Sequence, residues 1–212
     1  MTEITFCLSR AEFAQQFTAL PVHEAWGALQ TGNGRIAAES PLARVHRRGG
    51  SDDREAAFTL TSPAEPAHTL CTVAPEAGAA GSGTAYAVHD GTGHLIGRIV
   101  RERSPLGIRQ AWRIEDTVKQ CGAVAYKGNV RGWIAYWAVS PFWLVLALIH
   151  LLNGDLHPGR SVWSKPHRAR WRMQTGGGAK RAALDFNTGR YRADPGLLNV
   201  HLLYAQAVLY GA

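Results

Sequence analysis

Residues 194–211, DPGLLNVHLLYAQAVLYG, form a segment that is apolar on every side when it is drawn as a helix. Asp194 and Pro195 suit the N-cap and the first helical position, and eleven of the fourteen residues from Leu197 to Tyr210 are apolar. Because no polar face remains, such a helix must be enclosed by a protein core or by lipid. Fourteen residues rise only about 21 Å, less than the hydrocarbon layer of a membrane, so enclosure by protein is favoured.

The sequence before this helix predicts short strands, and these strands indicate what encloses the helix. Residues 168–173 alternate strictly, with Arg168, Arg170 and Arg172 on one face and Ala169, Trp171 and Met173 on the other. We expect further strands at residues 57–61, 69–73, 86–89, 95–100, 108–114, 182–186 and 190–192, many of them joined by turns rich in Gly, Asn and Asp. The pattern predicts a mainly β protein, an antiparallel closed β-barrel around the hydrophobic C-terminal helix, with an irregular N-terminal extension.

The N-terminal residues 1–83 carry weaker patterns. Ser9 and Glu12 fit a capping box that predicts a short helix over about residues 10–19. Residues 46–53 and 74–83 are rich in Gly and polar or small side chains, which indicates two loops. We expect residues 1–83 to supply strands to the same barrel that residues 84–212 complete.

The hairpin at residues 86–97, the turn at 186–191 and the terminal helix together resemble the tubby C-terminal-like superfamily, which includes the phospholipid scramblases and the LURP-one-related proteins. The resemblance covers about residues 84–212 and implies a twelve-stranded antiparallel barrel threaded by its C-terminal helix. Tubby domains bind phosphoinositide head groups through a basic patch. No phosphoinositide-binding motif can be matched residue by residue in this chain.

The net charge is confined to one region of the sequence. The chain has 212 residues, with 23 Lys and Arg against 16 Asp and Glu, a formal net charge of +7 and a globular composition that excludes collagen and coiled coils. Residues 155–192 hold nine basic and two acidic residues, which accounts for the whole excess. An acidic partner is therefore expected there, but nucleic acid is not favoured, because no recognised nucleic-acid-binding motif accompanies these residues.

The three arginines of residues 168–172 are the main candidate for a binding site. Guanidinium groups about 7 Å apart on one strand face repel each other unless anions lie opposite them, so a phosphate or an anionic head group would suit them. The alternative is an ordinary solvated outer face. The candidate ligand-binding residues are Arg168, Arg170, Arg172, Lys180 and Arg181.

Two further groups are candidates for chemistry inside or beside the barrel. His89, Asp90 and His94 lie at one hairpin turn and suit an acid–base pair or two metal ligands, but a third ligand and any known catalytic motif are missing. We therefore expect neither a metal nor a cofactor. His201, Gln206 and Trp171 are candidate pocket residues, for which satisfied core positions are the simpler interpretation.

The run from Trp133 to Leu152 contains no charged residue and is long enough to nominate a membrane span. Ser140 and Pro141 suit a helix start, so the run is better divided into a strand over residues 133–139 and a helix from Pro141. The three cysteines are far apart and fit neither a disulfide framework nor a zinc site. These features favour a cytoplasmic protein that associates peripherally with a membrane.

These features support three hypotheses about function. The first is a tubby-like or scramblase-like module that binds an anionic lipid or another small anionic ligand through its basic strand face. The second is a bacterial tailoring enzyme that uses the aromatic barrel interior as a hydrophobic substrate pocket, with His or Tyr as acid and base. The third and weaker hypothesis is a protein anchored in a membrane by residues 133–152. The sequence does not indicate an oligomeric state.

Overall fold

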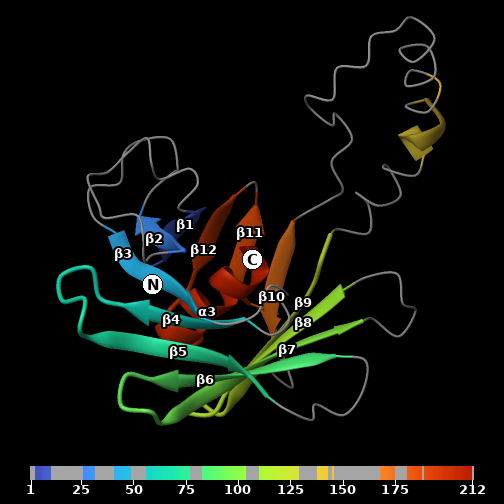
Figure 1. Cartoon of the computed structure of the whole chain (residues 1–212). Helices are drawn as coiled ribbons and strands as arrows, with labels where there is room; N and C mark the ends of the chain where they lie inside the picture. Colours follow the sequence, from blue (N-terminus) through green and yellow to red (C-terminus); the bar gives the residue numbers. More distant parts are fainter. Residues whose placement is uncertain are drawn as a thin grey trace, which may run out of the picture.

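The structure of the protein is a computed structural model, which describes residues 3–10, 26–31, 41–48, 56–76, 83–103, 110–128, 138–142, 145, 168–174, 181–187 and 189–211. Twelve strands from these residues close into one antiparallel barrel around a helix (Figure 1), which confirms the predicted fold class. The elements are β1 (Ile4–Arg10), β2 (Gly27–Thr31), β3 (Pro41–Arg48), β4 (Ala57–Thr61), β5 (Thr69–Pro75), β6 (Thr84–Asp90), β7 (Leu95–Arg103), β8 (Gln110–Asp116), β9 (Cys121–Tyr126), β10 (Ala169–Met173), β11 (Ala182–Asn187), β12 (Arg190–Ala193) and α3 (Val200–Gly211).

The barrel closes because the first strand pairs with the last. Phe6 of β1 lies opposite Tyr191 of β12, and Leu8 lies opposite Leu29 of β2. Every other strand pairs with the strands that precede and follow it along the chain. A closed sheet leaves no strand edge whose free backbone groups would recruit another chain. Strands β1 to β5, which come from the first 83 residues, thus belong to the same barrel as β6 to β12.

Alternation along the strands divides the core from the outer surface. In β8, Trp112 and Ile114 are buried, whereas Arg113 and Glu115 between and after them are exposed. In β10, the buried residues are Ala169, Trp171 and Met173, and the arginines lie outside. This period of two is the one expected for a sheet with one face in the core.

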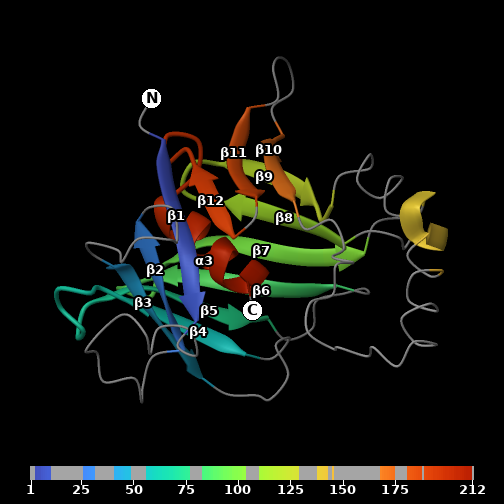
Figure 2. The ribbon, with the colours of Figure 1, turned by 90° about the horizontal axis from the view of Figure 1, so that it is seen from above.

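The helix α3 lies inside the barrel, with strands around it in both views (Figures 1 and 2). The ring of Tyr204 packs edge-on against Phe6 with 5.3 Å between ring centroids, and the Tyr191 hydroxyl donates to the Ala207 carbonyl over 3.1 Å. On another side, Gly97 of β7 lies so close to Leu202 that an added Cβ would stand 2.8 Å from its Cδ1 atom. The apolar surface of the helix is thus enclosed by protein, as the sequence predicts.

The helix begins five residues later than the Asp194–Pro195 pair predicts, so that prediction is wrong. The Asp194 side chain accepts from the Gly196 N–H, and its carbonyl accepts from the Leu197 N–H, which closes a turn instead of starting a helix. Asn199 is the N-cap, because its Oδ1 accepts from the His201 N–H over 2.9 Å.

Three expectations for the N-terminal part also fail. Ser9 and Arg10 end β1, and Ser9 pairs with Ala28 of β2, so the expected capping box at Ser9 does not form. The rest of the expected helix lies outside the described residues. The residues from His46 to Arg48 belong to β3, and β5 extends to Pro75, so the first residues of both predicted loops are strand; most of the remaining loop residues lie outside the described residues. The residues from His46 to Arg48 are strand because they pair with β4, and the end of β5 is strand because it pairs with β6. The sequence pattern does not show these pairings.

Little of the run from Trp133 to Leu152 lies within the described residues. The residues from Ala138 to Phe142 and Val145 are helical, so the end of the strand expected over residues 133–139 is helix instead. Ser140 is buried in this helix, whereas Val139 and Phe142 expose large apolar side chains. Among the described helices, none is long and apolar enough to cross a membrane.

Candidate functional site

Five arginines lie on the outer surface of the barrel, on and beside β10 and β12, with β11 between them. We call this set the outer arginine face: Arg168, Arg170, Arg172, Arg190 and Arg192. The face is built by the alternation of the two strands, whose inward residues fill the core and whose outward residues are all arginine. Neighbouring strands are about 4.8 Å apart, so the strand positions of the five arginines lie close together on the surface.

Asp185 of β11 is the one acidic residue in β10, β11 and β12. Its Oδ2 atom accepts from Arg170 Nε over 3.0 Å and lies 3.4 Å from a terminal nitrogen of Arg168. Its other oxygen, Oδ1, is buried and accepts no hydrogen bond from the described part of the chain. Asp185 therefore holds two guanidinium groups side by side while neutralising only one positive charge.

Within the described part of the chain, the remaining three arginines have no acidic partner. Arg172, Arg190 and Arg192 are exposed and form no ion pair with any described residue. Asp185 lies directly opposite Arg192 in the pairing of β11 with β12, but no hydrogen bond joins their side chains in the described structure. The exposed Arg181 follows nearby, since its carbonyl accepts from the Met173 N–H, and Lys180 lies outside the described residues.

The turn between β6 and β7 brings Asp90 and His94 together, and the Asp90 side chain stabilises the turn. Asp90 Oδ1 accepts from the Thr92 hydroxyl over 2.7 Å and from the backbone N–H groups of Thr92 and His94. The Thr92 hydroxyl bond, helped by those backbone bonds, lowers the pKa of Asp90. His89 lies opposite Thr72 in β5, away from this cluster of bonds. The Oδ1 atom of Asp90 therefore closes a hairpin turn.

His201 is half-buried at the start of α3. Burial lowers its pKa below the ordinary value of 6.5; Asp90 opposes this effect and His68 adds to it. The two charged groups that change the pKa of His201 lie near β5, β6 and β7. The structure therefore places His201 within electrostatic range of Asp90, which the sequence did not indicate. Among the described residues, no cluster of His, Cys, Asp and Glu suits a metal ion.

Gln206 occupies the centre of α3 and is fully buried. Neither its Nε2 nor its Oε1 atom has a hydrogen-bond partner in the described structure. The simpler interpretation from the sequence, a satisfied core glutamine, therefore does not hold. Trp171, the other buried pocket candidate, also has a buried Nε1–H without a partner.

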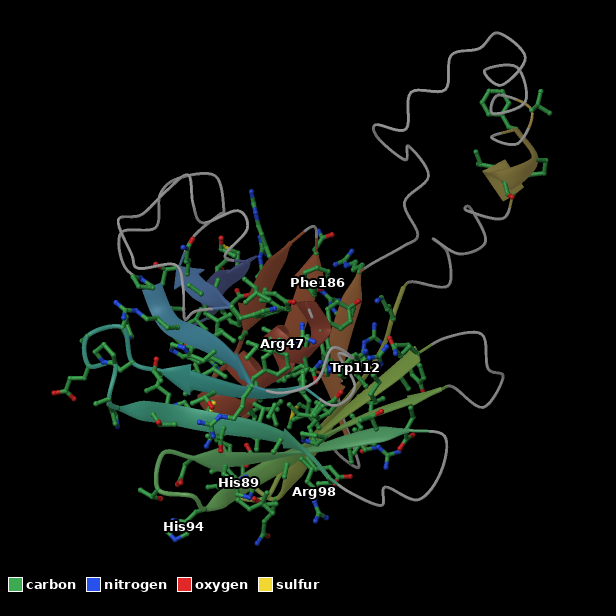
Figure 3. All side chains as sticks on the ribbon, in the orientation of Figure 1. Arg47, His89, His94, Arg98, Trp112 and Phe186 are labelled. Carbon is green, nitrogen blue, oxygen red and sulfur yellow. The ribbon has the colours of Figure 1, made fainter. Side chains whose placement is uncertain are left out.

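The structure shows a second cationic set that the sequence did not indicate, at the end of the barrel where α3 ends. We call it the cationic mouth: Arg47, Arg101 and Lys127. Arg47 pairs with the buried Phe58 and Arg101 with the buried Trp112, so both lie on the inner face of the sheet. Figure 3 places Arg47 and Trp112 around the centre of the barrel, whereas His89, His94 and Arg98 lie at its periphery.

Aromatic rings continue inward from the cationic mouth. The Lys127 Nζ atom lies 5.4 Å from the Tyr210 ring centroid, and the Arg101 guanidinium lies 5.5 Å from that of Trp112. Tyr210 in turn packs against Trp112, Trp171 and Phe186, with centroid separations of 5.9, 5.3 and 5.0 Å. Arg47 lies two residues after the buried Val45, so both residues lie on the inner face of β3. The sequence would have indicated this position of Arg47 only if the extent of β3 had been known.

The thiols and phenols of the barrel are poor nucleophiles and bases at neutral pH. Burial raises the pKa of Cys71 to about 12 and also raises that of Cys7 and Cys121. Burial likewise raises the pKa of Tyr191 and Tyr210. These groups therefore stay protonated in the folded protein near pH 7.

Comparisons with known proteins do not assign the chain to a family. No protein-family model, no curated protein and no solved structure matches it. The function must therefore be argued from the geometry of the two cationic sets.

Proposed function

We propose that the protein is a binding module that holds anionic lipid head groups at a membrane surface through the outer arginine face. The observation that carries this proposal is the surplus of guanidinium groups, five arginines against the single carboxylate of Asp185. A planar guanidinium matches phosphate and carboxylate oxygens with two parallel hydrogen bonds, so the face suits anionic head groups.

The position of the five arginines on the outside of the barrel favours a surface over a small enclosed ligand. Strand β12 presents Arg190 and Arg192 to solvent, and the neighbouring β11 and β10 present Asp185 and the remaining arginines. Near a membrane, each basic side chain contributes about 1 kcal/mol of attraction to acidic lipids, which falls off within about 10 Å at 0.1 M salt. The resemblance of residues 84–212 to the tubby C-terminal-like superfamily supports the same function, as a prediction from sequence.

Vesicle sedimentation tests this proposal. We expect the protein to sediment with vesicles containing 30% phosphatidylserine and to remain in solution with pure phosphatidylcholine. Inorganic phosphate at matched ionic strength separates the two sources of the same chemistry. Binding to vesicles that a millimolar phosphate concentration does not displace supports a membrane surface, and full displacement indicates a site for a free anion.

A single charge reversal with a matched control ties the binding to the face. Arg172→Glu alters an exposed arginine of the outer arginine face that forms no ion pair with a described residue, and Arg48→Glu makes the same change at an exposed residue of β3. We expect Arg172→Glu to weaken binding to acidic vesicles by about tenfold and Arg48→Glu to weaken it far less. Equal effects of the two variants would refute a localised site.

A further inference from the structure

Two arginines of the outer arginine face converge on a single oxygen atom of Asp185. Arg170 Nε donates to the Asp185 Oδ2 atom over 3.0 Å, and a terminal nitrogen of the same arginine lies 2.9 Å from that oxygen. A terminal nitrogen of Arg168 also donates to it, over 3.4 Å. The two guanidinium groups therefore lie side by side. We call Arg168, Arg170 and Asp185 the arginine clamp.

Asp185 forms the floor of the arginine clamp. Its side chain is only 16% exposed, whereas the side chains of Arg168 and Arg170 are 50% and 48% exposed. Because its Oδ1 atom is buried, the carboxylate acts on the two arginines through Oδ2. A guanidinium carries five N–H donors, so the bonds to one oxygen leave donors of both groups for an acceptor above the sheet. Asp185 thus positions two donor groups without meeting that acceptor itself.

The charge around the arginine clamp favours an anion with more than one negative charge. Arg192 of β12 lies opposite Asp185 on the side away from Arg170, and Arg172 follows Arg170 on the outer side of β10. Around Asp185, four guanidinium groups therefore surround one carboxylate in the described structure, a surplus of three positive charges. A phosphomonoester carries about −1.5 to −2 charges at pH 7, more than a carboxylate or a phosphodiester does.

The number of acceptor oxygens favours the same ligand. Two guanidinium groups that each donate two parallel hydrogen bonds need more than two acceptor oxygens. A phosphomonoester presents three terminal oxygens, whereas a carboxylate or a phosphodiester presents two. Both the charge and the hydrogen-bonding geometry of the arginine clamp therefore fit a terminal phosphate best.

We propose that the arginine clamp is a subsite for a phosphomonoester group, with Asp185 as a positioning residue. The inference rests on the proposed function and adds a preference among acidic lipids, since a head group that ends in a phosphomonoester binds more tightly than one whose phosphate is a diester. The terminal phosphate accepts hydrogen bonds from Arg168 and Arg170, and Arg172 and Arg192 add attractive charge.

Sedimentation of the full chain with two kinds of vesicle tests this preference. One contains phosphatidic acid and the other phosphatidylserine, each in phosphatidylcholine, with the acidic lipid adjusted until the two zeta potentials are equal. We expect about tenfold tighter binding to the phosphatidic acid vesicles. Equal binding to the two would overturn the inference and leave the proposed function standing, whereas binding to neither would refute the proposed function as well.

Asp185→Asn separates positioning from charge. The variant raises the net charge by one, so charge alone predicts tighter binding to both vesicles. Positioning predicts about tenfold weaker binding to phosphatidic acid with no loss of binding to phosphatidylserine. Glu76→Gln is the matched control, because it makes the same change at a carboxylate that accepts from Arg98 over 2.9 Å. Tighter binding of Asp185→Asn to phosphatidic acid would overturn the role of Asp185.

Arg170→Lys tests the arginine clamp without changing the net charge. A lysine ammonium cannot donate two parallel hydrogen bonds, so we expect the preference for phosphatidic acid to disappear and binding to phosphatidylserine to persist. Arg98→Lys alters an arginine that is likewise half exposed and paired with a carboxylate, and it should keep the full preference. The same preference in both variants would contradict the assigned subsite.

Glycerol 3-phosphate distinguishes the two sources of a phosphomonoester. It is added at matched ionic strength to the protein bound to phosphatidic acid vesicles. Displacement of the protein at low millimolar concentration would show that the subsite takes a free phosphomonoester, and retention would show that it takes the lipid head group. Both results support phosphomonoester recognition, and they assign its source to a soluble ligand or to a membrane lipid respectively.

Discussion

The buried carboxylate of Asp116, at the end of β8, accepts a hydrogen bond from the backbone N–H of Asn199 over 2.7 Å. Its other oxygen accepts from the N–H groups of Val118 and Lys119, so one side chain joins the β8–β9 turn to the start of α3. Lys119 adds a second tie, because its Nζ donates to the Pro195 carbonyl over 2.7 Å. The hydrophobic helix is therefore fixed in the barrel by polar bonds at its N-terminus.

Replacing this carboxylate should loosen the helix. Asp116→Asn keeps the size but turns an N–H₂ group toward backbone donors, and we expect it to reduce the free energy of unfolding by about 2–3 kcal/mol. Urea unfolding followed by tryptophan fluorescence measures the change. Glu115→Gln, the same chemical change on an exposed neighbour, should alter stability by less than about 0.5 kcal/mol. Similar losses in the two variants would contradict the anchoring role.

Gly97 sets the distance between β7 and α3. An alanine Cβ there would stand 2.8 Å from Leu202 Cδ1 and closer still to the Glu115 carbonyl, so a side chain or the strand must move. We expect Gly97→Ala to destabilise the protein by about 1–3 kcal/mol. Gly93→Ala is a useful comparison, because Gly93 has open space around it but a φ of 88°, so its cost comes from backbone strain alone. Gly97→Ala should cost less in a Leu202→Ala background than in the natural protein, and an equal cost in the two backgrounds would argue against this contact.

Gln206→Leu should stabilise the protein. The substitution keeps a similar volume and removes two buried polar atoms without partners, so unfolding should become harder by about 1–3 kcal/mol. Thermal unfolding by circular dichroism would show a higher Tm. A lower Tm would show that the amide is bonded within the folded barrel.

His201 should make stability depend on pH. Because burial lowers its folded pKa below 6.5, the unfolded chain takes up a proton first as the pH falls. The His201 contribution is therefore complete above pH 6.5 and is lost as the pH drops from there through the folded pKa. Urea midpoints measured from pH 7.5 to 5 should fall more steeply for the natural protein than for His201→Gln. His94→Gln, which alters a side chain that is 86% exposed, is the matched control.

The sequence predicts the barrel best where one strand face is buried and the other is charged. β10 shows this clearly, since Trp171 lies between two outward arginines and the alternation is strict. The enclosed helix is predicted as well, because a short helix with apolar residues such as Leu203 and Val208 on all sides must lie within a protein core. The start of α3 is not predicted, because it depends on the distant Asp116 carboxylate.

The candidate sites also differ in how far the sequence predicts them. Arg168, Arg170 and Arg172 are predicted from local alternation and lie on the outer side of β10, whereas Arg190 and Arg192 of β12 are not predicted as part of the site. The pairing of the outer arginine face with Asp185 depends on the register of β10 against β11, which no local pattern reveals. The sequence does not indicate the cationic mouth, because Arg47, Arg101 and Lys127 come from three separate strand ends, and only the closed barrel places all three on its inner face.

Binding to acidic membranes is assigned to the outer arginine face. The most direct test compares two double charge reversals of equal net charge in sedimentation with vesicles containing 30% phosphatidylserine at 0.1 M salt. Arg172→Glu with Arg192→Glu alters the face, and Arg48→Glu with Arg98→Glu alters exposed arginines on other strands.

The dissociation constant of the first variant should rise at least about thirtyfold over that of the natural protein, because two attractive charges become repulsive. The second variant should bind within about threefold of the natural protein. Equal weakening in both variants would show that net charge alone governs binding and would contradict the assigned face.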